Sequence, residues 1–203
     1  MFNLPKSTVI NKNIYKKYIY KRFSSEFSGK KRDEFNKDIG KITIINEISE
    51  QSVNIKRSEN ISAIFVVEIE LKREDFDEWN ISLISKLFGQ SIVLVLKYKN
   101  KYKLAIYEKK IFFSNWKTEE EINFELIGLD LSSVWDNLVL QITDIEIDKE
   151  NNLSEQIDIE ILKEELKTKI EKIEKKINRE NQAKKKFELY QQMKTYEKEL
   201  EEI

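Results

Sequence analysis

The sequence predicts an α/β fold: a mixed sheet with flanking helices, followed by a long C-terminal coiled-coil-like helix. Three observations carry this prediction. Residues Ile61–Lys72 have an apolar side chain at every second position, which is the period of a strand. The segment after Asp77 has the capping residues that mark the beginning and the end of a helix. The last 46 residues, Asp158–Ile203, contain neither glycine nor proline and repeat apolar residues at helical spacing.

The first strands are expected soon after residue 32. Lys41–Ile48 has the apolar content of a strand, and Val53–Ile55 is expected to continue it after a turn. In Ile61–Lys72 the odd-numbered residues form one apolar face, while Ile64 and Val66 on the other face are apolar as well. A strand that is buried on both sides for half its length belongs in the middle of a sheet.

A helix follows this strand and has recognisable ends. Asp77 is a good N-cap, and Phe76 and Ile81 are placed as a hydrophobic staple. The apolar stripe is expected to run to Phe88, and Gly89 to end the helix.

Two more strands and a second helix complete the predicted domain. Ser91–Tyr98 and Tyr102–Glu108 form a strand pair around Asn100, a residue that tolerates left-handed turn geometry. Ile111–Trp116 predicts a further strand, and Asp130 can cap a second helix.

The tail carries two apolar seams. Steps of three and four residues connect Leu162, Leu166, Ile170, Ile173 and Ile177, and then Leu189, Met193, Tyr196, Leu200 and Ile203. This is the two-per-heptad pattern of a coiled coil, so the seams are the predicted interface with a second copy or a partner helix. The runs lie twelve residues apart, which breaks the phase. We expect one continuous helix; a helical hairpin and packing against the chain's own domain are the alternatives.

Composition removes several kinds of chemistry. The chain has no cysteine and no histidine, so thiolate nucleophiles, Ser-His-Asp triads and Cys/His zinc sites are excluded. Its four glycines form no phosphate-binding loop. We therefore expect no cofactor and no transition metal, and favour a non-enzymatic protein. The absence of an apolar run of membrane length, or of a signal peptide, predicts a cytoplasmic protein.

Charge divides the chain unevenly. Residues 1–32 hold nine basic residues and one acidic residue, whereas residues 33–157 hold fifteen basic and twenty-four acidic residues. We expect a basic aromatic arm at 1–32, an α/β domain at 33–150, and a linker with the long helix at 151–203. Such asymmetry indicates a partner.

The arm is a candidate nucleic-acid interface. Basic side chains match phosphates, and the interleaved Tyr15, Tyr18 and Phe23 can stack on bases. The candidate residues are Lys16, Lys17, Lys21, Arg22, Lys30, Lys31 and Arg32. The alternative is that the aromatic residues dock the arm on the acidic central domain.

One pattern suggests catalysis. Glu68, Glu70 and Lys72 share one face of the best strand, as the core of a Mg²⁺-dependent nuclease does. Such a core also needs an acidic residue from a preceding strand, for which Glu47 and Glu50 are candidates. The alternative is a solvated strand end, because acidic and basic residues are abundant throughout the chain.

Several motifs occur in a familiar order. They are Leu4-Pro5-Lys6-Ser7-Thr8, the strand Val66–Lys72, Tyr107, Trp116, Leu129-Asp130-Leu131, Glu180-Asn181-Gln182, Lys185-Lys186 and Glu188-Leu189. In these the chain resembles the bacterial family of domain of unknown function 4391. The arm departs from the family pattern, with repeated Tyr and Lys where a second proline is expected.

The resemblance implies a protein encoded beside helicases and DNA methyltransferases of restriction or phage-defence type, and it supplies no catalytic residues. We therefore expect an accessory or scaffold protein. Its expected partners are a second copy of itself, a helicase or DNA methyltransferase of this type, or DNA or RNA. The alternatives are the Mg²⁺ nuclease and a nucleic-acid-binding module that uses the basic arm.

Overall fold

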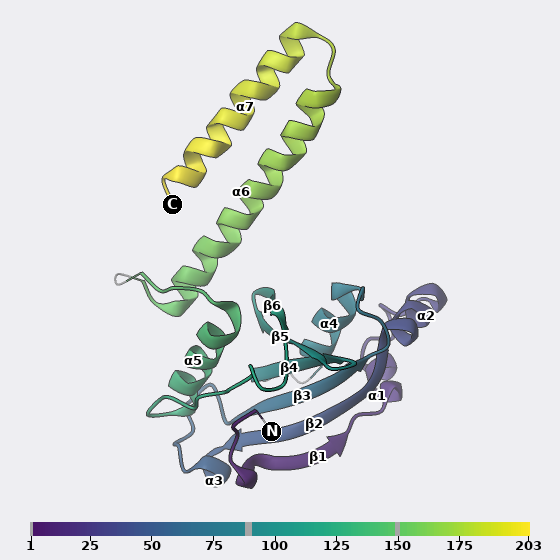
Figure 1. The fold of residues 1–203 in the computed structure, drawn as a ribbon, viewed down its shortest axis with the longest axis vertical. Coiled ribbons are helices and arrows are strands. Elements are labelled where there is room, and N and C mark those ends of the chain that lie inside the picture. Colours follow the sequence, from purple (N-terminus) through teal and green to yellow (C-terminus); the bar gives the residue numbers. More distant parts are fainter. Residues whose placement is uncertain (1, 88–90, 149–150) are drawn as a thin grey trace. The chain divides into compact units, whose positions relative to one another are not determined.

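The chain forms two compact units, Met1–Asp144 and Ile145–Ile203. The computed structural model describes residues 2–87, 91–148 and 151–203, and its elements are labelled in Figure 1. The boundary between the two units along the chain follows Asp144, the residue in the left-handed conformation that ends the helix Leu131–Thr143. The boundary therefore lies close to the end of the predicted α/β domain, and residue 32 is not a boundary between compact units.

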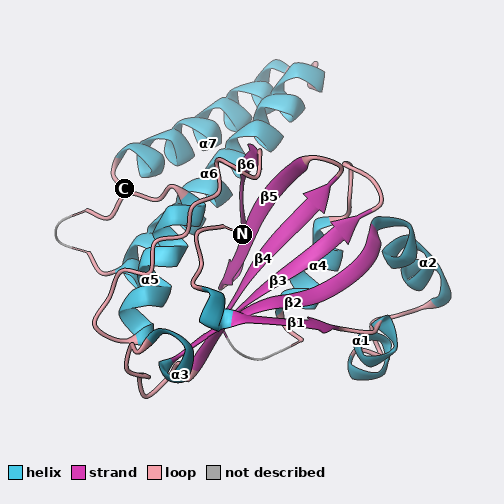
Figure 2. Cartoon of the chain, turned by 60° about the horizontal axis from the view of Figure 1, so that its bottom comes forward, coloured by secondary structure: helices cyan, strands magenta, loops and turns pink. Residues whose placement is uncertain are grey.

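The first unit is built on a mixed six-stranded sheet (Figure 2). Its strands are β1 (Val9–Asn13), β2 (Ile39–Ser49), β3 (Ala63–Leu71), β4 (Ser91–Tyr98), β5 (Lys101–Glu108) and β6 (Lys110–Lys117). They lie in the sheet in sequence order. Each neighbouring pair is antiparallel except β3 and β4, which run parallel. The fold class and the strands from β2 to β6 are as predicted, with ends shifted by one or two residues.

Helices cover both faces of the sheet. They are α1 (Lys16–Arg22), α2 (Gly29–Asp38), α4 (Glu78–Ser85) and α5 (Leu131–Thr143). Buried side chains of α1, α2 and α4 join one core cluster that includes Val67 and Ala105. Trp135 of α5 instead contacts Glu108, which lies three residues after Ala105 and therefore on the other face. The strand period thus places α5 opposite the other three helices.

The predicted central strand is confirmed. β3 lies third in the sheet, between β2 and β4. Ile64 and Val66 are buried, as are Val67 and Ile69 on the opposite face. Asp77 and Asp130 cap α4 and α5 as predicted, accepting hydrogen bonds from the Trp79 and Ser133 N–H groups. Phe88 and Gly89, predicted at the end of the first helix, lie outside the described residues.

One strand prediction is wrong. The segment expected to extend the first strand through Val53–Ile55 instead contains a short helix, α3 (Glu50–Val53). Its cause is a capping box, in which Ser49 and Ser52 satisfy each other's main-chain N–H groups. Asn54 then ends the helix in the left-handed conformation.

Residues 1–32 are part of the sheet unit. A 3₁₀ turn, Lys6–Thr8, leads into β1, which pairs with β2 at the edge of the sheet. Ile19 of α1 is fully buried, and Tyr20, Phe23 and Phe27 pack against the core cluster. The aromatic residues of this segment therefore dock it on the domain, which was one of the two interpretations of the predicted arm.

The second unit contains two helices, α6 (Leu153–Arg179) and α7 (Ala183–Glu201), that pack as a hairpin. Ile173, Ile177 and Met193 form its buried core, flanked by Ile170, Leu189 and Tyr196. None of the described helices is long and apolar enough to cross a membrane.

The expectation of one continuous helix is therefore wrong. The chain turns between Arg179 and Ala183, with Glu180 and Gln182 in extended conformations. Because this turn uses extended backbone, it needs neither the glycine nor the proline whose absence argued against a hairpin. The twelve-residue step between the seams was the signal for it.

Candidate functional site

The three residues of the predicted nuclease set do not converge. Glu68 and Glu70 share a face of β3, as predicted from the strand period. Lys72 follows the strand, and its Nζ donates a hydrogen bond of 2.6 Å to the Asn36 carbonyl of α2. The α2 helix covers the opposite face of the sheet, so the lysine is directed away from the two carboxylates.

The preceding strand adds no acidic ligand to this pair. In the β2–β3 register Glu68 faces Thr43, whereas Glu47 faces Phe65 and therefore lies on the other side of the sheet. Glu50 begins α3. Within the described ranges, no three acidic side chains gather closely enough to hold a metal ion. The geometry gives a Mg²⁺ core no support.

Glu68 occupies an unusual electrostatic position. Its Oε2 atom is buried and accepts no hydrogen bond in the described structure. Burial raises the pKa of Glu68, against the lowering effect of the nearby Lys97 ammonium, and Glu70 adds a further rise. A carboxylate in this position costs stability when it is charged.

The basic residues predicted to bind nucleic acid gather on α1 and α2. Six of the seven, Lys17, Lys21, Arg22, Lys30, Lys31 and Arg32, are exposed. Among the described residues, none of these six forms an ion pair with a carboxylate. Together with the exposed Tyr15 and Tyr18 they form what we call the α1–α2 basic surface.

Lys16 differs from the other six. Its Nζ donates hydrogen bonds to the Asn36 side chain and to the Ile39 carbonyl, at the C-terminal end of α2. Burial, together with the smaller effect of the Lys72 charge, lowers the pKa of Lys16 to about 8. Lys16 therefore joins α1 to α2 and is not placed to meet a phosphate.

Three of the six cations of the α1–α2 basic surface lie against aromatic rings. Lys17 Nζ is 5.5 Å from the Tyr15 ring centroid and 5.3 Å from that of Tyr18. The guanidinium carbon of Arg32 is 4.4 Å from the Tyr20 ring centroid, and Lys31 Nζ is 4.5 Å from that of Trp79. These contacts hold long side chains near the protein while their charges stay in water.

The predicted interface seam is occupied within the hairpin. Ile170, Ile173 and Ile177 of α6 face Leu189, Met193 and Tyr196 of α7 in one cluster. Leu166 is buried too, whereas Leu162 is 42 % exposed and Leu200 is half-buried. While the hairpin is closed, most of the seam is not available to a second chain.

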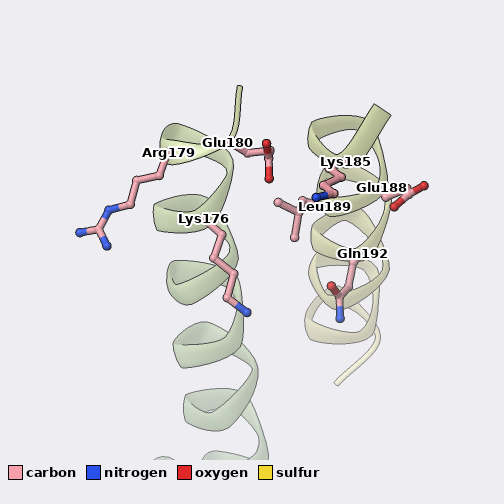
Figure 3. Close-up of a pocket in the computed structure, with 7 residues that line it drawn as sticks. All are labelled: Lys176, Arg179, Glu180, Lys185, Glu188, Leu189 and Gln192. Atoms are coloured by element: carbon pink, nitrogen blue, oxygen red, sulfur yellow. The ribbon is translucent and has the colours of Figure 1, made fainter. Parts of the chain in front are cut away.

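The turn end of the hairpin has a shallow hollow of about 550 Å³. Figure 3 shows its lining: Lys176, Arg179, Glu180, Lys185, Glu188, Leu189 and Gln192. Arg179 and Glu188 point away from the gap between the helices (Figure 3). The Glu180 carboxylate accepts a hydrogen bond of 2.8 Å from the Gln182 N–H and so stabilises the turn. Both basic and acidic side chains thus line the hollow.

Two polar arrangements were not predicted from the sequence. Asp38 is fully buried and accepts hydrogen bonds from Arg73, from the Asp77 N–H and from Asn80. Glu108 accepts a bond of 2.6 Å from Trp135 Nε1, and burial raises the pKa of Glu108. Both carboxylates lie among charged residues in the sequence, so no pattern marks them as buried.

The fold and its surfaces define an α/β protein with a helical hairpin and a basic, aromatic surface. A family model for a domain of unknown function, DUF4391, matches residues 2–200. The chain therefore belongs to this family, as its sequence motifs indicated. Searches of curated proteins and of solved structures found no match.

Proposed function

We propose that this protein is a non-enzymatic accessory protein that binds nucleic acid through the α1–α2 basic surface. The observation that carries the proposal is the set of six exposed cations without carboxylate partners among the described residues, next to two exposed tyrosines. Phosphate contacts by such residues supply most of the affinity of non-specific nucleic-acid binding. The surface lies on folded helices anchored by Ile19 and Phe35, so its charges are held in place before binding.

The setting we propose is a bacterial restriction-like or phage-defence system in the cytoplasm, beside a helicase or DNA methyltransferase. The motif order discussed above supports this setting. The hairpin supports a protein partner: Phe187 and Tyr190 of α7 are 63 % and 44 % exposed and lie three residues apart on one side of the helix. Exposed aromatic residues are common anchors of protein interfaces. Co-purification of the neighbouring helicase or methyltransferase should be lost in Phe187→Ala/Tyr190→Ala.

The nucleic-acid proposal is tested by fluorescence anisotropy with labelled DNA and RNA across a salt series. Replacing Lys17, Lys21 and Arg22 by alanine removes three phosphate contacts, which should lower the salt slope by about 2. The matched control replaces three exposed cations outside this surface, Lys6, Lys56 and Arg57, and should leave the slope unchanged. Equal weakening by both triple variants, or no binding by the natural chain at about 50 mM salt, contradicts the proposal.

The nuclease alternative has its own assay. Incubation of plasmid DNA with Mg²⁺ or Mn²⁺ should give no cleavage by the natural chain, and no difference between it and Glu70→Gln. Cleavage that disappears in Glu70→Gln would restore the catalytic interpretation.

A further inference from the structure

Tyr15, the N-cap of α1, and Tyr18, in the first turn of that helix, are aromatic residues that the protein core does not use. They are 62 % and 55 % exposed, whereas Ile19 is fully buried and Tyr20 packs against the core cluster. The buried Ile19 fixes the rotation of the helix about its axis. Tyr15 and Tyr18 lie three residues apart at the start of α1, and both side chains face solvent.

The rings of Tyr15 and Tyr18 are neighbours, and we call this pair the platform. Their centroids are 6.4 Å apart with an angle of 56° between the ring planes. The first turn of α1 fixes their spacing, since the Tyr18 N–H donates a bond of 2.9 Å to the Tyr15 carbonyl. The platform is thus set by main-chain geometry as well as by side-chain rotamers.

Charge surrounds the platform. Lys17 Nζ lies over one face of each ring, and Lys21 and Arg22 follow one turn later in α1. No acidic residue occurs in α1. A base stacked on a tyrosine would therefore have cations within side-chain reach of its phosphates.

Resting on the proposed function, we propose that the ligand of this surface is single-stranded nucleic acid, held by stacking of bases on Tyr15 and Tyr18. In a duplex each base is stacked between its neighbours, so exposed ring faces have no partner there and only the cations contribute. A single strand offers open base faces to the rings and phosphates to the same cations. The platform therefore selects single strands over duplexes.

The test measures anisotropy of three labelled probes of one mixed sequence of about 20 nucleotides: single-stranded DNA, single-stranded RNA and duplex DNA. The perturbed variant is Tyr15→Leu/Tyr18→Leu. Loss of base stacking should weaken binding of a single-stranded probe by about tenfold or more. Binding of the duplex should change by less than about twofold, because the cations remain. The DNA and RNA arms show which single strand is preferred.

Two matched variants keep the result interpretable. Tyr15→Phe/Tyr18→Phe retains the ring faces and should keep the affinity of the natural chain. Phe187→Leu/Tyr190→Leu removes two exposed rings from α7 and should leave binding of the three probes unchanged. Circular dichroism of each variant checks that the fold is intact.

The outcomes separate the two proposals. If Tyr15→Leu/Tyr18→Leu binds single strands as the natural chain does, while the Lys17, Lys21 and Arg22 variant is weakened, the platform is wrong and the basic surface stands. Parallel losses on single strands and duplex overturn selection by stacking, as does an equal loss in Phe187→Leu/Tyr190→Leu. If the natural chain binds none of the probes, both proposals fail.

Discussion

Replacement of the buried Asp38 carboxylate tests how the α1–α2 basic surface is anchored. Asp38 is the last residue of α2, and its carboxylate oxygens accept bonds from the Asp77 N–H at 2.8 Å and from Asn80 Nδ2 at 2.7 Å. Arg73 donates a further bond, but its side chain is 48 % exposed. One carboxylate thus connects the end of α2 to the start of α4 and to the end of β3.

The expected cost of Asp38→Asn follows from these partners. The variant keeps the shape of the side chain but loses its charge and turns one acceptor into a donor. Bonds to a charged group contribute about 1.5–3 kcal/mol each, and a buried donor left without a partner costs about 1–3 kcal/mol. Since the remaining oxygen can still accept, we expect a loss of about 3 kcal/mol in the free energy of unfolding. Arg73→Met should cost clearly less than Asp38→Asn, because the carboxylate keeps its two N–H donors and the exposed arginine contributes only as a surface pair does.

The assay is urea unfolding followed by tryptophan fluorescence. All three tryptophans, Trp79, Trp116 and Trp135, lie in the sheet unit, so their signal reports that unit alone. The urea midpoint should fall without a change in the m-value. The double variant Asp38→Asn/Arg73→Met should match Asp38→Asn. A loss below about 1 kcal/mol for Asp38→Asn, or an equal loss for Arg73→Met, refutes the assignment of the stability to the two N–H bonds.

Two further predictions concern the hairpin and the buried carboxylate of β3. Ile173→Ala should destabilise the hairpin by about 3 kcal/mol and lower the melting temperature of its helices, while the unfolding transition seen by tryptophan fluorescence stays unchanged. Substitution of the exposed Lys175 by alanine is the control. A parallel shift of the fluorescence transition contradicts the prediction. Because the folded state raises the pKa of Glu68, stability falls as pH rises through that pKa. Glu68→Gln should therefore be more stable than the natural chain at pH 7, and the difference should vanish below the unfolded pKa near 4.5. If the variant is instead less stable at pH 7, the charged carboxylate stabilises the fold and the prediction is wrong.

The strands could be predicted because their burial follows a simple period. In β3 every second residue faces each side, so the sequence identified both the central strand and the shared face of Glu68 and Glu70. The position of Lys72 could not be predicted in this way. Its partner is a carbonyl of α2, 36 residues earlier, and the strand period contains no information about that contact.

The basic surface was predicted by composition, but not its internal division. Lys16 and Lys17 are adjacent and chemically identical, yet one is bonded to the end of α2 and the other stays in water. That difference arises from the rotation of α1, which Ile19 sets by entering the core. The hairpin turn was not the favoured prediction because Glu180 and Gln182 form it with extended backbone, which any side chain can adopt.

The position of β1 has a consequence for the order of folding. β5 follows β4 through a two-residue turn, and β6 follows β5 after the single residue Lys109, so these pairings have low contact order. β1 must instead meet β2 across an intervening segment that contains all of α1 and α2, and closing such a loop costs more entropy. All five residues of β1 are exposed, so little burial rewards its pairing. β1 is thus expected to join the sheet last during folding and to be among the first elements to open in the native state.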